Sequence, residues 1–191
     1  ALAADPHVLV RREALRTLAA LAAIDQLGVI EAALDDGEPG VHFAAADALA
    51  KVNGPQTPGR LLAVLEKHGM AKTREACLVA LQSVLAQAEP ALIEGAKAAL
   101  YPVREVSVRA LEKSTSPGSL AALLSALRED EDYRIRFWAT RGLARRHQPE
   151  AVQALLAALK DPEPTVQLGA ARALGELAPA LSEEEGNEAL S

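Results

Sequence analysis

The sequence has few of the residues on which disulfides, thiolate metal sites and aromatic packing depend. Among 191 residues there is one cysteine, Cys77, so no disulfide can form within the chain and no cysteine-based zinc site is available. Aromatic residues make up 3% of the chain, and no apolar run approaches the roughly 18 residues that would predict a membrane-spanning helix. The scarcity of cysteine fits a reducing compartment, and we expect a cytoplasmic protein.

Motifs for catalysis and cofactor binding are also missing. The chain contains no GxxxxGK[ST], GxGxxG, HExxH or GxSxG pattern. The four histidines are far apart and form no i, i+4 pair on a predicted helix. The acidic stretch REDEDYR at 128–134 lacks the glycine and the spaced oxygen ligands of a calcium loop, so we interpret it as a solvated turn. We therefore predict no enzyme, no cofactor and no metal site.

Positive charge is in short supply. The formal net charge is -6, which counts against nucleic acid as a partner because a nucleic-acid binder needs a basic surface. Half of the residues are hydrophobic, and alanine, leucine and valine supply most of them. Alanine and leucine favour helices because they lose little side-chain freedom there, and β-branched runs are absent. The composition therefore predicts an all-α protein.

The sequence DPEPTVQLGAARALGEL, residues 161–177, is one copy of a unit that recurs along the chain. An anchor residue in each copy, aliphatic except for Thr73, is followed eight residues later by leucine in all six cases and four residues later by a small residue. Successive anchors are 31, 32, 30, 32 and 31 residues apart. They are Val10, Val41, Thr73, Val103, Ile135 and Val166. Offsets of 0, 4 and 8 share one helix face, so each anchor begins an amphipathic helix that a neighbour can approach closely.

A second amphipathic segment precedes every anchor helix except the first. Proline and glycine separate the segments, and we place Pro58, Pro90 and Pro117 among the breakers between units. Neither helix of a pair can bury its apolar face alone, so the pairs must stack into a solenoid of about five and a half helix-pair repeats. We predict one domain over residues 1–181 and an acidic tail over 182–191. Because the first unit has only its second helix, we expect a fragment of a larger protein.

The unit LLAALKDPEPTVQLGAARALGEL resembles a HEAT repeat of the short type that also occurs in phycobilisome-lyase-like proteins. This resemblance implies a right-handed α-α superhelix whose second helices line the concave side. It also implies a ladder between units, formed by an aspartate at the turn and an arginine one residue after the anchor. The matching residues are Arg11, Arg74, Arg104 and Arg136, with Asp5, Asp36, Asp130 and Asp161.

A candidate binding surface follows from the positions two and six residues after each anchor, which lie opposite the buried face. In the last three units this surface contains three successive arginines beside aromatic and apolar residues. Arginine and aromatic residues are enriched at binding hot spots. The candidate residues are Phe43, Arg109, Phe137, Trp138, Arg141, Arg145, Leu168 and Arg172. The structural alternative is that Phe137 and Trp138 pack between units and that the arginines only solubilise the surface.

Three functions are compatible with this pattern. The first is a non-enzymatic scaffold whose groove binds a protein or peptide, with an acidic ligand or another segment of the parent chain as its occupant. The second is a nucleic-acid-binding protein, since some HEAT-like proteins handle damaged DNA with a basic concave face. The third is a bilin lyase or chaperone, as the phycobilisome-lyase resemblance implies. We predict the first, because the chain is acidic and has no catalytic nucleophile in a recognisable motif.

Overall fold

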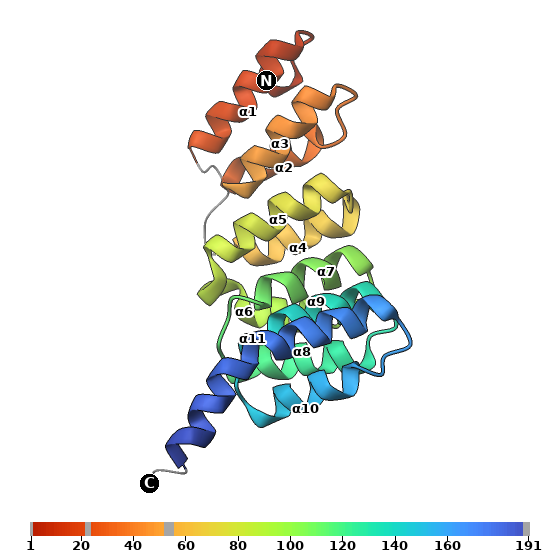
Figure 1. Ribbon diagram of the computed structural model, residues 1–191. Helices are drawn as coiled ribbons and strands as arrows, with labels where there is room; N and C mark the ends of the chain where they lie inside the picture. The colour runs from red at the N-terminus through yellow and green to blue at the C-terminus, as the bar shows by residue number, and fades with distance from the viewer. Residues whose placement is uncertain (1, 22–23, 52–55, 189–191) are drawn as a thin grey trace.

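The computed structural model describes residues 2–21, 24–51 and 56–188, with side chains described for residues 3–21, 25–51 and 56–178. Within these ranges the chain forms helices and no strands (Figure 1). Two short 3-10 helices lie at Leu2–Ala4 and Ile24–Gln26. The α-helices are α1 (Val8–Ala20), α2 (Leu27–Ala33), α3 (Pro39–Ala50), α4 (Thr57–Lys67), α5 (Ala71–Ser83), α6 (Leu85–Gly95), α7 (Tyr101–Leu111), α8 (Pro117–Glu129), α9 (Tyr133–Leu143), α10 (Pro149–Ala158) and α11 (Pro164–Glu188).

The helices start where the sequence supplies a start signal. Proline occupies one of the first two positions of α3, α4, α7, α8 and α10, where its missing N–H costs no hydrogen bond. The Ser116 hydroxyl caps α8 by accepting a hydrogen bond from the Ser119 N–H at 3.0 Å. The Asp132 carboxylate caps α9 in the same way, so part of the acidic stretch at 128–134 is a helix cap.

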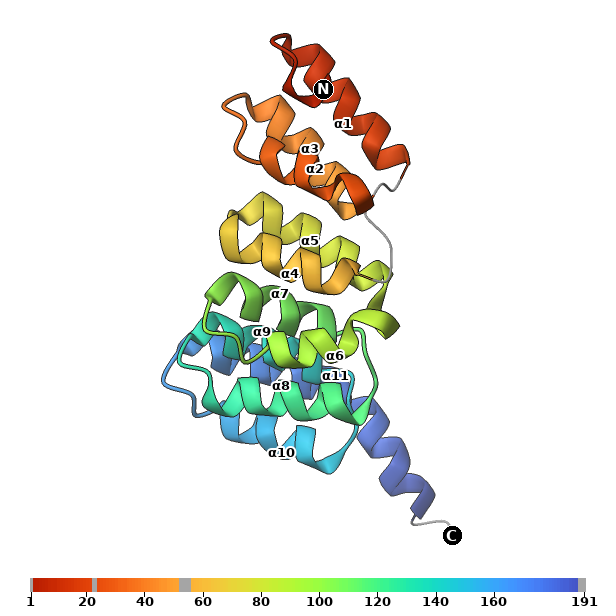
Figure 2. The same cartoon turned by 180° about the vertical axis from the view of Figure 1, so that it is seen from behind.

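The helices form two layers. The second helix of each unit packs against the second helix of the next, which gives the layer α1, α3, α5, α7, α9 and α11 that faces the viewer in Figure 1. The first helices, α2, α4, α6, α8 and α10, form the layer seen in front in Figure 2. We call these the second-helix layer and the first-helix layer. The arrangement confirms the predicted all-α superhelix of stacked helix pairs.

The core runs along the whole stack between the layers. All anchors from Val41 to Val166 are buried, and Val10 in the first unit is half-buried. Burial of the leucine eight residues after each anchor also increases from the ends of the stack to its middle. Leu18 and Leu174 at the two ends are half-buried, and the four leucines between them are fully buried. Stacking therefore buries the apolar faces, as expected for units that contact only their neighbours.

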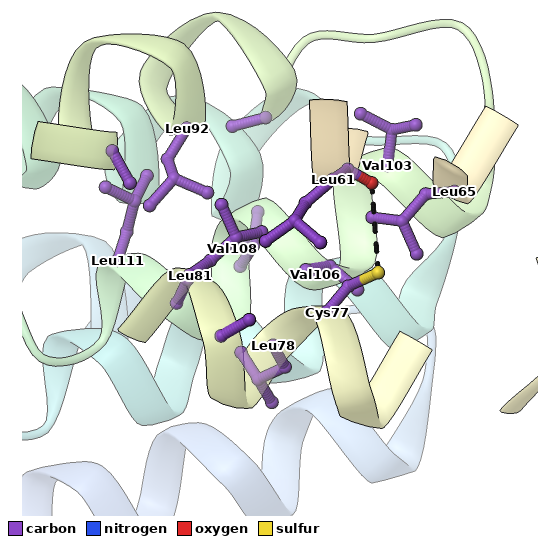
Figure 3. Close-up of a cluster of buried hydrophobic side chains, with 14 of the residues drawn as sticks. Leu61, Leu65, Cys77, Leu78, Leu81, Leu92, Val103, Val106, Val108 and Leu111 are labelled. Carbon is purple, nitrogen blue, oxygen red and sulfur yellow. Dashed lines mark hydrogen bonds between the residues drawn. The ribbon is translucent and has the colours of Figure 1, made fainter. Parts of the chain in front are cut away.

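Cys77 takes the small-residue position of the third unit (Figure 3). Its thiol lies 3.8 Å from the carbonyl oxygen of Leu61 on α4, and its side chain is fully buried in the hydrophobic core. Burial raises the pKa of the thiol to about 12, because the charged thiolate is disfavoured away from water. This cysteine packs as a small hydrophobe.

Arginine and aspartate connect neighbouring units at three places. Arg136 donates from Nε and Nη2 to Asp161 at 2.8 and 2.9 Å, and its Nη1 donates to two carbonyls of its own turn. The pairs Arg11–Asp36 and Arg104–Asp130 repeat this geometry. Hydrogen bonds from arginine lower the pKa values of Asp36 and Asp161 below their usual range. The predicted ladder is therefore present between units one and two, four and five, and five and six.

The junction between units two and three is built differently. His42 and His68 stand where the ladder would have arginine and aspartate, and Lys67 and His68 instead reach Glu31 at 2.9 and 3.5 Å. In the described residues α2 and α4 hardly approach each other, whereas α4, α6, α8 and α10 pack in sequence. The packing across this junction therefore comes mainly from α3 and α5.

Pro90 and the predicted division of the chain at 181/182 both fall within helices. Pro90 lies inside α6 and not between units, so its placement as a breaker was wrong. The reason is that Pro90 is the sixth residue of the helix, where its missing N–H removes a single backbone bond. The division of the chain at 181/182 remains a prediction, and α11 continues through that point to Glu188.

Candidate functional site

A pocket of about 300 Å³ opens on the second-helix layer between the last three units. We call it the α9–α11 pocket. Its charged lining consists of Glu112, Arg141, Arg145, Arg172 and Glu176, and its uncharged lining of Phe137, Ala144, Gly169 and Ala173. Four of the predicted site residues, Phe137, Arg141, Arg145 and Arg172, meet in this one cavity.

The floor of the α9–α11 pocket depends on close packing between α9 and α11. A Cβ atom on Gly169 would overlap the Thr140 hydroxyl and come within 3.0 Å of the Phe137 ring. The absence of a side chain at 169 therefore lets the two helices approach and brings Phe137 to the pocket. Ala144 and Ala173 keep the remaining floor small and apolar. The cavity exists because small residues occupy these positions.

The arginines of the α9–α11 pocket differ in how they are engaged. Arg141 lies over the Trp138 ring, with its guanidinium carbon 5.1 Å from the ring centroid, and its Nη2 is 4.0 Å from Glu112. Arg145 and Arg172 are exposed and have no ion-pair or hydrogen-bond partner among the side chains that the structure describes. Two guanidinium groups are thus available to a ligand without breaking an existing interaction.

Arg109 lies outside the α9–α11 pocket. It donates to Glu105 at 3.2 Å and to Glu75 at 2.9 Å, and only 17% of its side chain is exposed. Its guanidinium carbon is 4.6 Å from the centroid of the Trp138 ring. Among the described residues, Glu75 and Glu105 are the acids that pair with Arg109. Glu105, which the sequence pattern places on the exposed face, is buried and also lies 2.7 Å from Arg74. This network connects α5, α7 and α9 and is a structural unit.

The other predicted site residues are divided between packing and exposure. Trp138 and Phe137 are both half-buried against the core, with their ring centroids 5.4 Å apart. Leu168 on α11 is 50% exposed but does not line the α9–α11 pocket. Phe43 is 51% exposed and lines a separate, shallower depression in the N-terminal units, with Met70 and Lys72 beside it.

Sequence reasoning missed five residues of the α9–α11 pocket: Glu112, Ala144, Gly169, Ala173 and Glu176. A signal for three of them, Glu112, Ala144 and Glu176, was available. Glu112 and Ala144 both stand nine residues after their anchors, and Arg145 and Glu176 both stand ten residues after theirs. The ends of the second helices thus contribute to the same surface as the positions two and six residues after the anchor.

The described side chains bring together no group of three histidine, cysteine or acidic residues able to hold a metal ion. No helix in the described part of the chain is long and apolar enough to cross a bilayer.

The two layers of stacked helix pairs define an α-solenoid. A family model for HEAT repeats matches residues 1–82, 58–144 and 120–190, so the chain belongs to the HEAT repeat family. No curated protein matches the chain.

Solved structures show the same fold. YibA of Escherichia coli is 16% identical, with 96% of this chain and 72% of that chain covered and a TM-score of 0.53. An engineered protein is 22% identical, with 92% and 95% covered and a TM-score of 0.50. At these identities the likeness concerns the fold alone.

Proposed function

We propose that this HEAT repeat chain is a non-enzymatic interaction module that binds an acidic segment of a protein partner in the α9–α11 pocket. One observation carries the proposal. Arg145 and Arg172, from two successive units, line one cavity with an apolar floor, and neither has a partner in the described structure. Charged groups that are already exposed and unpaired lose no internal interaction when a ligand engages them.

The composition of the α9–α11 pocket supports this function. Arginine and aromatic residues in a concave site are typical of binding hot spots, and a stacked solenoid holds them on rigid helices. Arg141 is held in place by its stack on Trp138, so it loses less side-chain freedom on binding than a free arginine would. A protein ligand is favoured over nucleic acid because acids line the same pocket and the whole chain carries a net charge of -6.

A peptide-display experiment tests the proposal. A random peptide library is selected on the wild-type chain, on the double variant Arg145→Glu/Arg172→Glu and on Arg128→Glu. Arg128 is an exposed arginine on α8, in the first-helix layer, and serves as a single charge-reversal control away from the pocket.

We expect acidic peptides to be enriched on the wild type and on Arg128→Glu and to be lost on the double variant. Circular dichroism should show equal helix content for all three chains. Enrichment that survives the double reversal, or no enrichment on any chain, contradicts the proposal. Retention of a DNA duplex with a steep loss at higher salt would support the nucleic-acid function instead.

A further inference from the structure

The charges around the α9–α11 pocket are nearly balanced. Three arginines and two glutamates line it, which gives a formal charge of +1 (three minus two). Arg141 already faces Glu112 at 4.0 Å and the Trp138 ring. Glu176 follows Arg172 by one helical turn on α11 and is exposed like it. A ligand with a single negative charge therefore neutralises the pocket, and a ligand with two leaves an excess beside two carboxylates.

The size and floor of the α9–α11 pocket limit the rest of the ligand. A volume of about 300 Å³ lies at the lower end of ligand pockets, where one side chain and part of its neighbour fit but a folded element does not. Phe137, Ala144 and Ala173 offer apolar surface to that side chain. Binding of one apolar side chain there gains the free energy of burying its surface, while the arginines remain at the polar rim.

We infer that the α9–α11 pocket recognises a two-residue feature of an extended peptide: an apolar side chain on the Phe137 floor beside a carboxylate side chain that Arg145 and Arg172 bind. This inference rests on the proposed function and specifies its ligand. The pocket discriminates against a phosphorylated side chain in the same position. A phosphate carries close to two negative charges at neutral pH, and beside acidic residues it is repelled. Glu112 and Glu176 are the residues that reject it.

The test uses four synthetic peptides with a common glycine-serine background and a central Leu-Glu, Leu-Gln, Ala-Glu or Leu-phosphoserine pair. Binding is measured by titrating them into ¹⁵N-labelled protein, because Trp138 is the single tryptophan and its indole N–H gives one resolved signal next to the pocket. The Gly169 backbone amide is a second reporter at the floor.

We expect the Leu-Glu peptide to bind with the lowest dissociation constant. Loss of the charge in Leu-Gln and loss of the apolar side chain in Ala-Glu should each raise the dissociation constant about tenfold, the factor that one charge-assisted hydrogen bond or one buried side chain supplies. The Leu-phosphoserine peptide should bind more weakly than Leu-Glu.

A variant without the two pocket glutamates tests the role of charge by the order of peptide affinities and not by their absolute values. Glu112→Gln/Glu176→Gln raises the formal charge of the α9–α11 pocket from +1 to +3, and it should reverse the order so that Leu-phosphoserine binds more tightly than Leu-Glu. The charge-matched control is Glu66→Gln/Glu150→Gln, which changes two exposed acids on the first-helix layer and should keep the wild-type order.

The outcomes separate this inference from the proposed function. If Leu-phosphoserine binds the wild type more tightly than Leu-Glu, or if Leu-Gln binds as tightly as Leu-Glu, the inference fails, although the proposed function stands. If none of the four peptides moves the Trp138 and Gly169 signals at millimolar concentration, the inference also fails. The display selection on Arg145→Glu/Arg172→Glu then decides the proposed function on its own.

Discussion

Removal of one partner from an arginine–aspartate pair should destabilise the stack locally, and the Arg136–Asp161 pair offers the sharpest case. Asp161 accepts two hydrogen bonds from Arg136 and a third from the Glu163 N–H at 2.8 Å. The side chains of Arg136 and Asp161 are 13% and 9% exposed. The change Asp161→Ala leaves a largely buried guanidinium without its acid and removes the acceptor of the Glu163 N–H in the turn before α11.

The expected cost lies between two limits. An exposed ion pair contributes about 0–1 kcal/mol, whereas removing one partner of a buried pair costs about 3–5 kcal/mol. With most of both side chains covered, we expect Asp161→Ala to lower the free energy of unfolding by about 3 kcal/mol at pH 7. For a urea m-value of about 2 kcal/mol/M, the midpoint falls by about 1.5 M.

Urea unfolding followed by Trp138 fluorescence and by circular dichroism tests this expectation, because the tryptophan reports on unit five and circular dichroism on all helices. Asp36→Ala is the matched control, since it breaks the equivalent pair between units one and two. We expect Asp161→Ala to lower both midpoints and Asp36→Ala to lower mainly the circular-dichroism midpoint. Equal fluorescence shifts in the two variants, or a shift below about 0.5 kcal/mol for Asp161→Ala, would refute the reasoning.

The stability lost in Asp161→Ala should depend on pH in a predictable direction. Arg136 lowers the pKa of Asp161 in the folded chain, so this aspartate contributes stability above its unfolded pKa of about 3.9, and the contribution is lost as the pH falls through the lower folded pKa. The difference between the wild type and Asp161→Ala should therefore be largest at neutral pH and should shrink below about pH 4.

Four further predictions follow from particular residues. Thr73→Val should raise the urea midpoint, with a gain of about 1 kcal/mol, because the Thr73 hydroxyl is buried without a hydrogen-bond partner. Cys77 should not react with a thiol reagent at pH 8 until the chain is unfolded, since burial raises its pKa to about 12. Leu168→Glu should weaken binding of the Leu-Glu peptide several-fold by pairing with Arg172 one turn away. Backbone amides of α4 that face α2 should exchange with deuterium faster than those of α8 that face α6, because α2 and α4 hardly pack.

The fold could be predicted from the sequence because the repeat fixes it at every unit. The anchor, the small residue and the leucine recur at constant offsets, so six weak signals reinforce one another and place the same face of every second helix in the core. The arginine–aspartate pairs were implied by the resemblance to HEAT repeats and not by the spacing itself. Pro90 escaped prediction because a proline inside a helix cannot be told in sequence from a proline between helices.

The site could be predicted only in part. The position of a residue within the repeat predicts which helix face it lies on, but it does not predict whether its side chain already pairs with another residue. Phe137, Arg141, Arg145 and Arg172 do reach one pocket. Arg109 belongs to the same column as Arg141 and Arg172 but pairs with Glu75, which is 34 residues earlier in the chain. A flexible arginine can form ion pairs with acids of its own unit or of neighbouring units. The spacing of residues along one helix does not predict which of these pairs forms.

The position two residues after each anchor explains which arginines remain available. The arginine six residues after an anchor lies one turn from this position in its own unit and beside the same position in the preceding unit. For Arg109 both positions are acidic, Glu105 and Glu75, and both bind it. For Arg172 they are Leu168 and Phe137, and no acid takes their place in the described structure. The residues two positions after the anchor are therefore acidic around Arg109, which forms an internal ion-pair network in unit four. The corresponding residues around Arg172 are apolar, which leaves this arginine available to a ligand of the pocket in units five and six.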